Sequence, residues 1–125
     1  MTLSETWYPK NGTVLCLNGK SIIASGDFDV VRVEPQVKFT LTDCIATPGR
    51  ITHDAGKIGR GVRMYGTMEI YGGMICGNTA MPDNSYSNST WGGGVYVAGT
   101  NQGSAKFVMY GGSISGGNNA TYGGG

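Results

Sequence analysis

The chain has 125 residues, and its nine basic and eight acidic side chains give a formal net charge of +1. These charges are spread without a basic block, so the composition argues against a nucleic-acid-binding protein, which normally shows a basic face. No apolar stretch approaches the ~20 residues of a transmembrane helix, and the first residues lack the pattern of a signal peptide. Glycine occupies 23 positions. Short alternating runs of Val, Ile, Thr, Tyr and Phe between Gly and Asn predict an all-β protein.

In chain order, residues 1–12 come before the first repeated pattern and are predicted to form an N-terminal cap segment. Trp7, Tyr8 and Pro9 are placed to cover the apolar cross-section of the first coil. Residues 13–125 are predicted to form the repeats. A first, weak copy runs through residues 14–19 into 21–23, and a second runs through 31–33, 39–43 and 49–52.

The two later copies carry the strongest signal. Residues 68–78 and 107–116 share the pattern Tyr-Gly-Gly-x-Ile-x-Gly, and each is preceded by a short strand pattern, at 61–64 and at 94–97. Self-similarity of this kind indicates a solenoid, in which each repeat buries its apolar face against its neighbours. We therefore expect a right-handed parallel β-helix of about four coils, each with up to three short strands.

Because strand side chains alternate between two faces, aligning the repeats predicts which side chains point inward. Three interior stacks are expected, with Arg32, Arg63 and Tyr96 in line outside the first and Thr42, Tyr71 and Tyr110 outside the second. The interior stacks are Val31, Val33, Val62, Met64, Val95 and Val97; Phe39, Leu41, Met68, Ile70, Phe107 and Met109; and Ile22, Ile51, Ile75 and Ile114.

The turns between strands are assigned to glycine pairs, which adopt positive φ without a Cβ clash. Asn tolerates the same conformation, so Asn18, Asn78 and Asn118 are candidates for a ladder of side-chain amides from coil to coil. The alternative is that each Asn caps its own turn. Both interpretations are open at this point.

Residues 15–22, residues 39–44 and the phrases Tyr-Gly-Gly-x-Ile-x-Gly-Asn and Gly-Gly-Gly-Val-Tyr-Val carry a family resemblance. From about Thr13 to Gly125 the chain resembles the repeats of large bacterial surface proteins, common in gut Firmicutes and described as right-handed parallel β-helix or adhesin-like proteins. The resemblance implies secretion, display at the cell surface and a role in adhesion or as a stalk. Those proteins carry export and anchoring segments, and their repeats continue beyond the position of Gly125, so we expect a truncated piece.

The expected function is that of a non-enzymatic structural spacer or adhesive surface, with an unidentified host or bacterial glycan or protein as partner. Exposed aromatic rings suit sugars or protein partners because they give a large contact area with few lost rotamers. The alternative is simple stacking between coils. The candidate surface consists of Tyr71, Tyr110, Trp91, Tyr96 and Tyr86. At the C-terminal end, nothing in the sequence is placed to cover the apolar cross-section of the last coil. This predicts end-to-end self-association or fraying of that coil.

The competing hypothesis is a carbohydrate-active β-helix, either a polysaccharide lyase or glycosidase or its sugar-binding remnant. It requires two converging carboxyl groups, for which Asp43 with Glu69 or Asp27 with Asp29 are the candidates. Calcium at Asp27 and Asp29 lacks further ligands. We therefore expect no catalytic residue, metal or cofactor, and we expect His53 to lie on the surface.

Three cysteines, Cys16, Cys44 and Cys76, cannot all pair within one chain, and none of the spacings suits a zinc or redox motif. The expectation is three small buried hydrophobic side chains. One disulfide plus a free thiol is the alternative.

Overall fold

The computed structural model describes residues 1–82 and 89–125. The described residues form twelve short β-strands without a helix, which confirms the all-β prediction. Correspondingly, no described segment is a helix long and apolar enough to cross a membrane.

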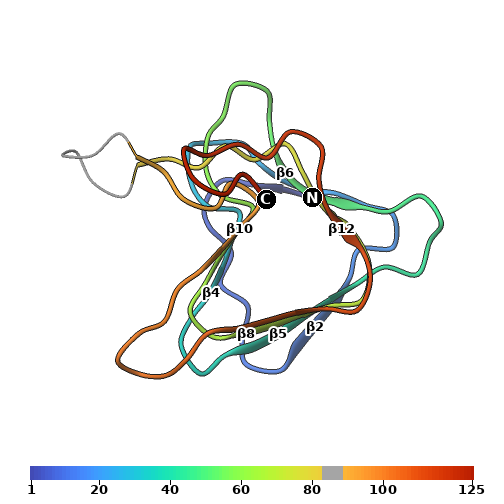
Figure 1. The fold of residues 1–125 in the computed structure, drawn as a ribbon. Coiled ribbons are helices and arrows are strands. Elements are labelled where there is room, and N and C mark those ends of the chain that lie inside the picture. The colour runs from blue at the N-terminus through green and yellow to red at the C-terminus, as the bar shows by residue number, and fades with distance from the viewer. Residues whose placement is uncertain (83–88) are drawn as a thin grey trace.

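The strands belong to three parallel sheets that the chain visits in rotation (Figure 1). We name the sheets A, B and C, with the strands given below, and we call one passage of the chain through C, A and B a circuit. Consecutive strands never pair: the first strand bonds to the third, and every other pairing joins strands three positions apart in the chain. Sheet A contains β1 (Thr2–Leu3), β3 (Ile22–Ala24), β6 (Arg50–His53), β9 (Met74–Ile75) and β12 (Ser113–Ile114); sheet B contains β4 (Val31–Val33), β7 (Val62–Met64) and β10 (Val95–Val97); sheet C contains β2 (Thr13–Cys16), β5 (Lys38–Thr42), β8 (Thr67–Ile70) and β11 (Lys106–Met109).

The register of all three sheets confirms the predicted interior stacks. In sheet B, Val31 pairs with Val62 and Val62 with Val95. In the same way Phe39, Met68 and Phe107 align in sheet C, and Ile22, Ile51, Ile75 and Ile114 align in sheet A. The members from the middle circuits are almost fully buried, so they form one continuous apolar core.

The last circuit has the same register but a less buried core face. Val97 and Met109 are 45% and 40% exposed, whereas Met64 and Ile70, their partners in the preceding strands, are 0% and 2% exposed. The difference has a simple cause, because a side chain in a stack is covered from both directions only when a circuit lies on each side.

The first residues extend the sheets rather than standing apart from them. Thr2 and Leu3 pair with Ile23 and Ala24 at the edge of sheet A, and Trp7 makes a parallel bridge to Val31 of sheet B. The Trp7 ring meets Phe39 edge-on, with ring centroids 5.5 Å apart. The division into a cap of residues 1–12 and repeats of residues 13–125 stays a prediction.

Each Tyr-Gly-Gly phrase uses its two glycines for different purposes. The second glycine has positive φ, +93° at Gly73 and +77° at Gly112, as the turn prediction required. The first glycine lies against the preceding circuit, and a Cβ on Gly72 would come within 2.8 Å of the Asp43 backbone nitrogen. The corner is therefore closed both by backbone conformation and by lack of space.

We expect Gly72→Ala to destabilise the fold by about 1–3 kcal/mol, the usual cost of overpacking, because backbone atoms must move to admit the methyl group. Denaturant unfolding followed by circular dichroism measures this change. The matched control is Gly99→Ala, where the methyl group meets no atom within 4 Å. Equal stabilities of the two variants would contradict the crowding at this corner.

Candidate functional site

Two pairs of exposed aromatic rings lie at corners between sheets. Tyr71 and Tyr110 follow β8 and β11, and their rings stack with centroids 4.7 Å apart and planes 15° from parallel. Both rings remain accessible, with Tyr71 50% and Tyr110 63% exposed. The prediction that these two tyrosines align outside the second stack is confirmed.

The second pair joins Trp91 to Tyr122, and sequence reasoning named only the first of these as a site residue. The two rings stack with centroids 5.6 Å apart, and the residues make a parallel backbone bridge. Trp91 is 41% and Tyr122 56% exposed. Because Trp91 lies between β9 and β10, this pair occupies a different corner from Tyr71 and Tyr110.

The remaining candidates are less available. Tyr96 is half-buried in β10, with the guanidinium carbons of Arg60 and Arg63 4.9 Å and 5.9 Å from its ring centroid. Tyr86 lies outside the described residues. Of the four candidates that the structure describes, only Tyr71 and Tyr110 stack on each other, and Trp91 and Tyr96 have other partners.

The outer face of sheet B carries a ladder that sequence reasoning missed. Arg32 pairs in register with Arg63, as predicted, but these arginines do not simply extend into water. The Tyr65 ring lies between them, 5.2 Å from the guanidinium carbon of Arg32 and 5.5 Å from that of Arg63. Tyr8 and Tyr96 contact the ends of the ladder. Attraction between cation and ring thus offsets repulsion between the stacked charges. The sequence feature that could have predicted this ladder is Tyr65, which follows Arg63 by two residues and therefore points to the same face of the sheet.

Carboxylates complete the charge balance of the ladder. Arg32 forms an ion pair with Glu34 at 2.6 Å, although its Nε–H is not aimed well enough to count as a hydrogen bond. Asp29, which is 8% exposed, lies 3.5 Å from a nitrogen of Arg60 and 3.9 Å from one of Arg63. The distances identify Asp29 as a shared counter-ion.

Arg60 is the most deeply buried charged residue that the structure describes, with 1% exposure. Its Nε donates to the carbonyl oxygen of Trp91 at 3.0 Å, and Nη2 donates to that of Met81 at 3.5 Å. The backbone N–H of Arg60 in turn donates to Asp29 at 2.8 Å. One guanidinium therefore connects the segment that leads into β7 to the backbone at Met81 and at Trp91, which both lie between β9 and β10.

A second buried polar cluster corrects the expectation for His53 and decides between the two interpretations of the asparagines. His53 is not a surface residue: it is 8% exposed, and its ring nitrogens lie 2.8 Å from Asn78 Oδ1 and from the Phe28 carbonyl oxygen. The Asn78 amide donates to Asn118 Oδ1 at 3.1 Å, so the coil-to-coil amide ladder is present for these two. Asn18, by contrast, is exposed in its own turn at φ +51°. For Asn18 the alternative, a residue in its own turn, is what the structure shows, and His53 occupies the ladder position next to Asn78.

The carboxylates proposed for catalysis engage separate partners. Asp43 accepts hydrogen bonds from the backbone N–H groups of Gly19, Ile45 and Gly49. Glu69 pairs with the Lys38 ammonium at 3.0 Å. Their register differs as well, because Glu69 pairs with Thr40 and not with Asp43.

Asp27 and Asp29 also diverge. Asp27 accepts the backbone N–H of Ile58, while Asp29 serves Arg60 and Arg63. Among the described residues, no group of three or more His, Cys, Asp or Glu side chains is arranged to hold a metal ion.

Glu69 links the first tyrosine pair to sheet C. The Tyr71 hydroxyl donates to Glu69 Oε2 at 3.4 Å, and the other carboxylate oxygen faces Lys38. The hydrogen bond and charge of Glu69 raise the pKa of Lys38. Partial burial, followed by the Glu69 charge, raises the pKa of Tyr71.

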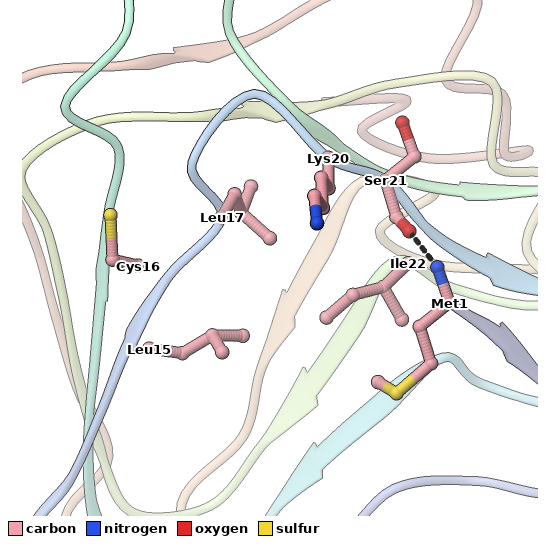
Figure 2. A pocket seen from close by; sticks show the side chains of 7 residues that line it. All are labelled: Met1, Leu15, Cys16, Leu17, Lys20, Ser21 and Ile22. Carbon is pink, nitrogen blue, oxygen red and sulfur yellow. Dashed lines mark hydrogen bonds between the residues drawn. The ribbon is translucent and has the colours of Figure 1, made fainter.

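At the first circuit, an apolar cavity of about 190 Å³ opens between β2 and β3. Figure 2 shows Leu15, Leu17 and Ile22 facing this space, with Met1 beside it. The Met1 ammonium donates to the Ser21 carbonyl oxygen at 2.6 Å, which fixes the chain start against β3. The lining residues of the cavity carry two cationic groups, the Lys20 side chain and the Met1 ammonium, and no carboxylate.

No family model, curated protein or solved structure matches this chain. The geometry of its residues is thus the basis for a functional argument.

We expect Arg60→Met to destabilise the fold by about 3–5 kcal/mol, because it leaves Asp29 buried beside a single, more distant arginine. Chemical denaturation gives the change in free energy of unfolding. The matched control is Arg50→Met, which alters an exposed arginine and is expected to change stability by no more than ~0.5 kcal/mol. A comparable stability of both variants would contradict the anchoring role of Arg60.

The stability should also depend on the ionisation of Asp43. The Gly49 N–H, followed by those of Ile45 and Gly19, lowers the pKa of this carboxyl below its usual 3.8. A folded-state pKa below the unfolded one stabilises the protein above the unfolded-state pKa, and this stabilisation is lost as the pH falls through the folded-state pKa. We expect the thermal midpoint to decrease below about pH 4, and part of this decrease to be absent in Asp43→Asn. Asp54→Asn, at an exposed carboxyl, is the control. Identical pH profiles for Asp43→Asn and the unmodified chain would contradict this role.

Proposed function

We propose that this chain is a short right-handed parallel β-helix of about four coils, a non-enzymatic segment of a secreted bacterial surface protein that serves as spacer and adhesive surface. The observation that carries the proposal is the rotation of the chain through three parallel sheets with an unchanged register. Such stacking leaves each coil in contact only with the coils before and after it, which is the organisation of a solenoid.

The role of spacer is supported by the direction in which the side-chain contacts run. Aliphatic stacks inside, aromatic stacks at the corners and the arginine–tyrosine ladder outside all join one circuit to the next. With ~4.8 Å between parallel strands, four coils span only ~20 Å. The segment is therefore one module of a longer stalk in this proposal.

The role of adhesive surface is supported by the two aromatic pairs. Tyr71, Tyr110, Trp91 and Tyr122 keep between 41% and 63% of their surface exposed although each ring already has a stacking partner. Rings held in this way lose little conformational freedom when a sugar ring or an apolar protein group packs on them. A glycan is the partner class that we favour, because sugars offer flat C–H faces next to hydroxyl groups.

The carbohydrate-active enzyme is the weaker alternative. Hydrolysis of a glycosidic bond requires two carboxyl groups ~5–9 Å apart across the bond. Asp43 and Glu69 instead have their own hydrogen-bond or ion-pair partners, and Asp29 is the counter-ion of the buried Arg60. These engagements favour a binding role over a catalytic one.

Self-association end to end belongs to the same proposal. The exposed Val97 and Met109 lie on the outermost strands of sheets B and C at one end, and the apolar cavity beside β2 lies at the other. Unpaired strand edges at both ends invite pairing with another chain. Cell-surface localisation is supported by the resemblance of the repeats to those of bacterial surface proteins.

The test is a glycan array probed with the purified chain and with Tyr110→Ala and Trp91→Ala variants. We expect binding to at least one class of glycan, and about a tenfold loss in a variant that lacks the relevant ring, which corresponds to ~1.4 kcal/mol. Tyr110→Phe is the matched control, because it keeps the stacking ring and should keep the binding.

Glycan binding that is unchanged in both alanine variants would contradict the proposal that the aromatic surface is the adhesive site. An array without any binding would leave the spacer as the function and remove the adhesive part of the proposal.

A further inference from the structure

Two of the three cysteines lie face to face on the surface. Cys16 is the last residue of β2, and Cys44 follows the end of β5 in the neighbouring circuit. Their sulfur atoms are 3.5 Å apart, and both residues are exposed, whereas Cys76 is buried. The expectation of three buried hydrophobic side chains is therefore wrong for Cys16 and Cys44 and correct only for Cys76.

The backbone around the two sulfurs is fixed on both strands. Cys16 pairs in register with Thr42, and the N–H of Leu17 donates to the Thr42 carbonyl oxygen at 3.0 Å. The neighbouring strands therefore cannot slide past each other without breaking ladder hydrogen bonds. Two cysteines held in this way meet whenever the fold is formed.

The Asp43 carboxylate fixes the loop that carries Cys44. It accepts the N–H of Ile45 at 3.2 Å, which follows Cys44, and the N–H of Gly19 at 3.1 Å, which belongs to the turn just after Cys16. A third hydrogen bond, from Gly49 at 2.7 Å, closes the loop at its far end. The carboxylate thus ties the loop around Cys44 to the turn beside Cys16.

We propose that Cys16 and Cys44 form a modification site, an intramolecular disulfide that joins the first and second circuits. A disulfide has an S–S bond of ~2.05 Å, so the sulfurs must approach by roughly 1.5 Å. Both side chains are exposed, and their sulfurs are already in contact in the thiol form. The inference does not depend on the proposed adhesive function.

The oxidant is a small-molecule disulfide of the glutathione class. The thiolate of one cysteine attacks a sulfur of the oxidant, forms a mixed disulfide and releases the first small thiolate. The second cysteine, deprotonated, attacks the protein sulfur of that mixed disulfide and expels the other small thiolate. Two electrons pass from the protein to the oxidant, and the two protons lost by the cysteines are taken up by the released thiolates.

The contact between the two thiols influences the rate of this reaction. Hydrogen bonding to Cys16 is the main reason that the pKa of Cys44 is raised. Since the thiolate is the attacking species, oxidation should accelerate as the pH increases above neutrality. Independently of pH, the disulfide is favoured in secretory or extracellular environments, because thiols are not kept reduced there.

Oxidation should stabilise the fold. The crosslink joins residues 28 positions apart, and closing a loop of this length restricts the unfolded chain. We expect the unfolding midpoint of the oxidised chain to lie at least about 5 °C above that of the reduced chain.

The experiment treats the reduced full chain with oxidised glutathione at mildly alkaline pH and removes excess reagent. Titration of thiols under denaturing conditions should show a decrease from three thiols to one, and the intact mass of the monomer should decrease by about 2 Da, the two hydrogens lost on oxidation. Peptide mapping should join the segments that contain Cys16 and Cys44. The variant Cys76→Ala should form the same crosslink, while Cys16→Ser and Cys44→Ser should not.

Stable glutathione adducts at Cys16 and Cys44, a crosslink between chains or to Cys76, or three unreacted thiols would overturn the proposal. An unchanged unfolding midpoint despite a mapped Cys16–Cys44 bond would overturn its stabilising role. Circular dichroism of the two serine variants checks that they are folded, which the exposure of both positions leads us to expect.

Discussion

Parallel pairing between strands of successive circuits is the constraint on which the rest of this structure depends. From β2 onward each strand bonds to strands three positions away in the chain, and β1 bonds to β3, so the fold consists almost entirely of contacts that are distant in sequence. Once the register is set, alternation of side chains determines what points inward. Val62 is therefore buried between Val31 and Val95 for the same reason that Arg63 is placed between Arg32 and Tyr96.

A repeated sequence has an electrostatic cost, because side chains at equivalent positions lie next to each other and like charges then repel. The chain reduces this cost in two ways. On sheet B, Tyr65 lies between two arginines and Asp29 serves as a common counter-ion for Arg60 and Arg63. In the His53–Asn78–Asn118 cluster, neutral amides donate and accept along the stack, so that buried polar atoms find partners in the next circuit.

The sequence was sufficient to predict most strands from β2 onward and their inward faces, because period-two alternation recurs in the copies and the Tyr-Gly-Gly phrase fixes the alignment of the two later ones. It was insufficient at the corners, where loops differ in length between circuits and the repeat no longer defines position. His53 is a strand residue whose partner in the next circuit is Asn78, a pairing that no alignment of similar side chains reveals. Cys44 lies in a corner loop that Asp43 folds back, and its contact with Cys16 has no counterpart in the other circuits. Of the two aromatic pairs, the sequence predicted only Tyr71 with Tyr110. The stacking of Tyr122 on Trp91 was not predicted, because Tyr122 lies in a turn outside the repeated strands.

The Arg60 guanidinium bonds to the carbonyl groups of Met81 and Trp91, which lie between β9 and β10, and it pairs with Asp29, which precedes β4. Arg60 itself precedes β7, so one buried cation holds together backbone and side-chain groups of three successive circuits. A single substitution at this position would therefore loosen the circuits on both sides of its own at the same time.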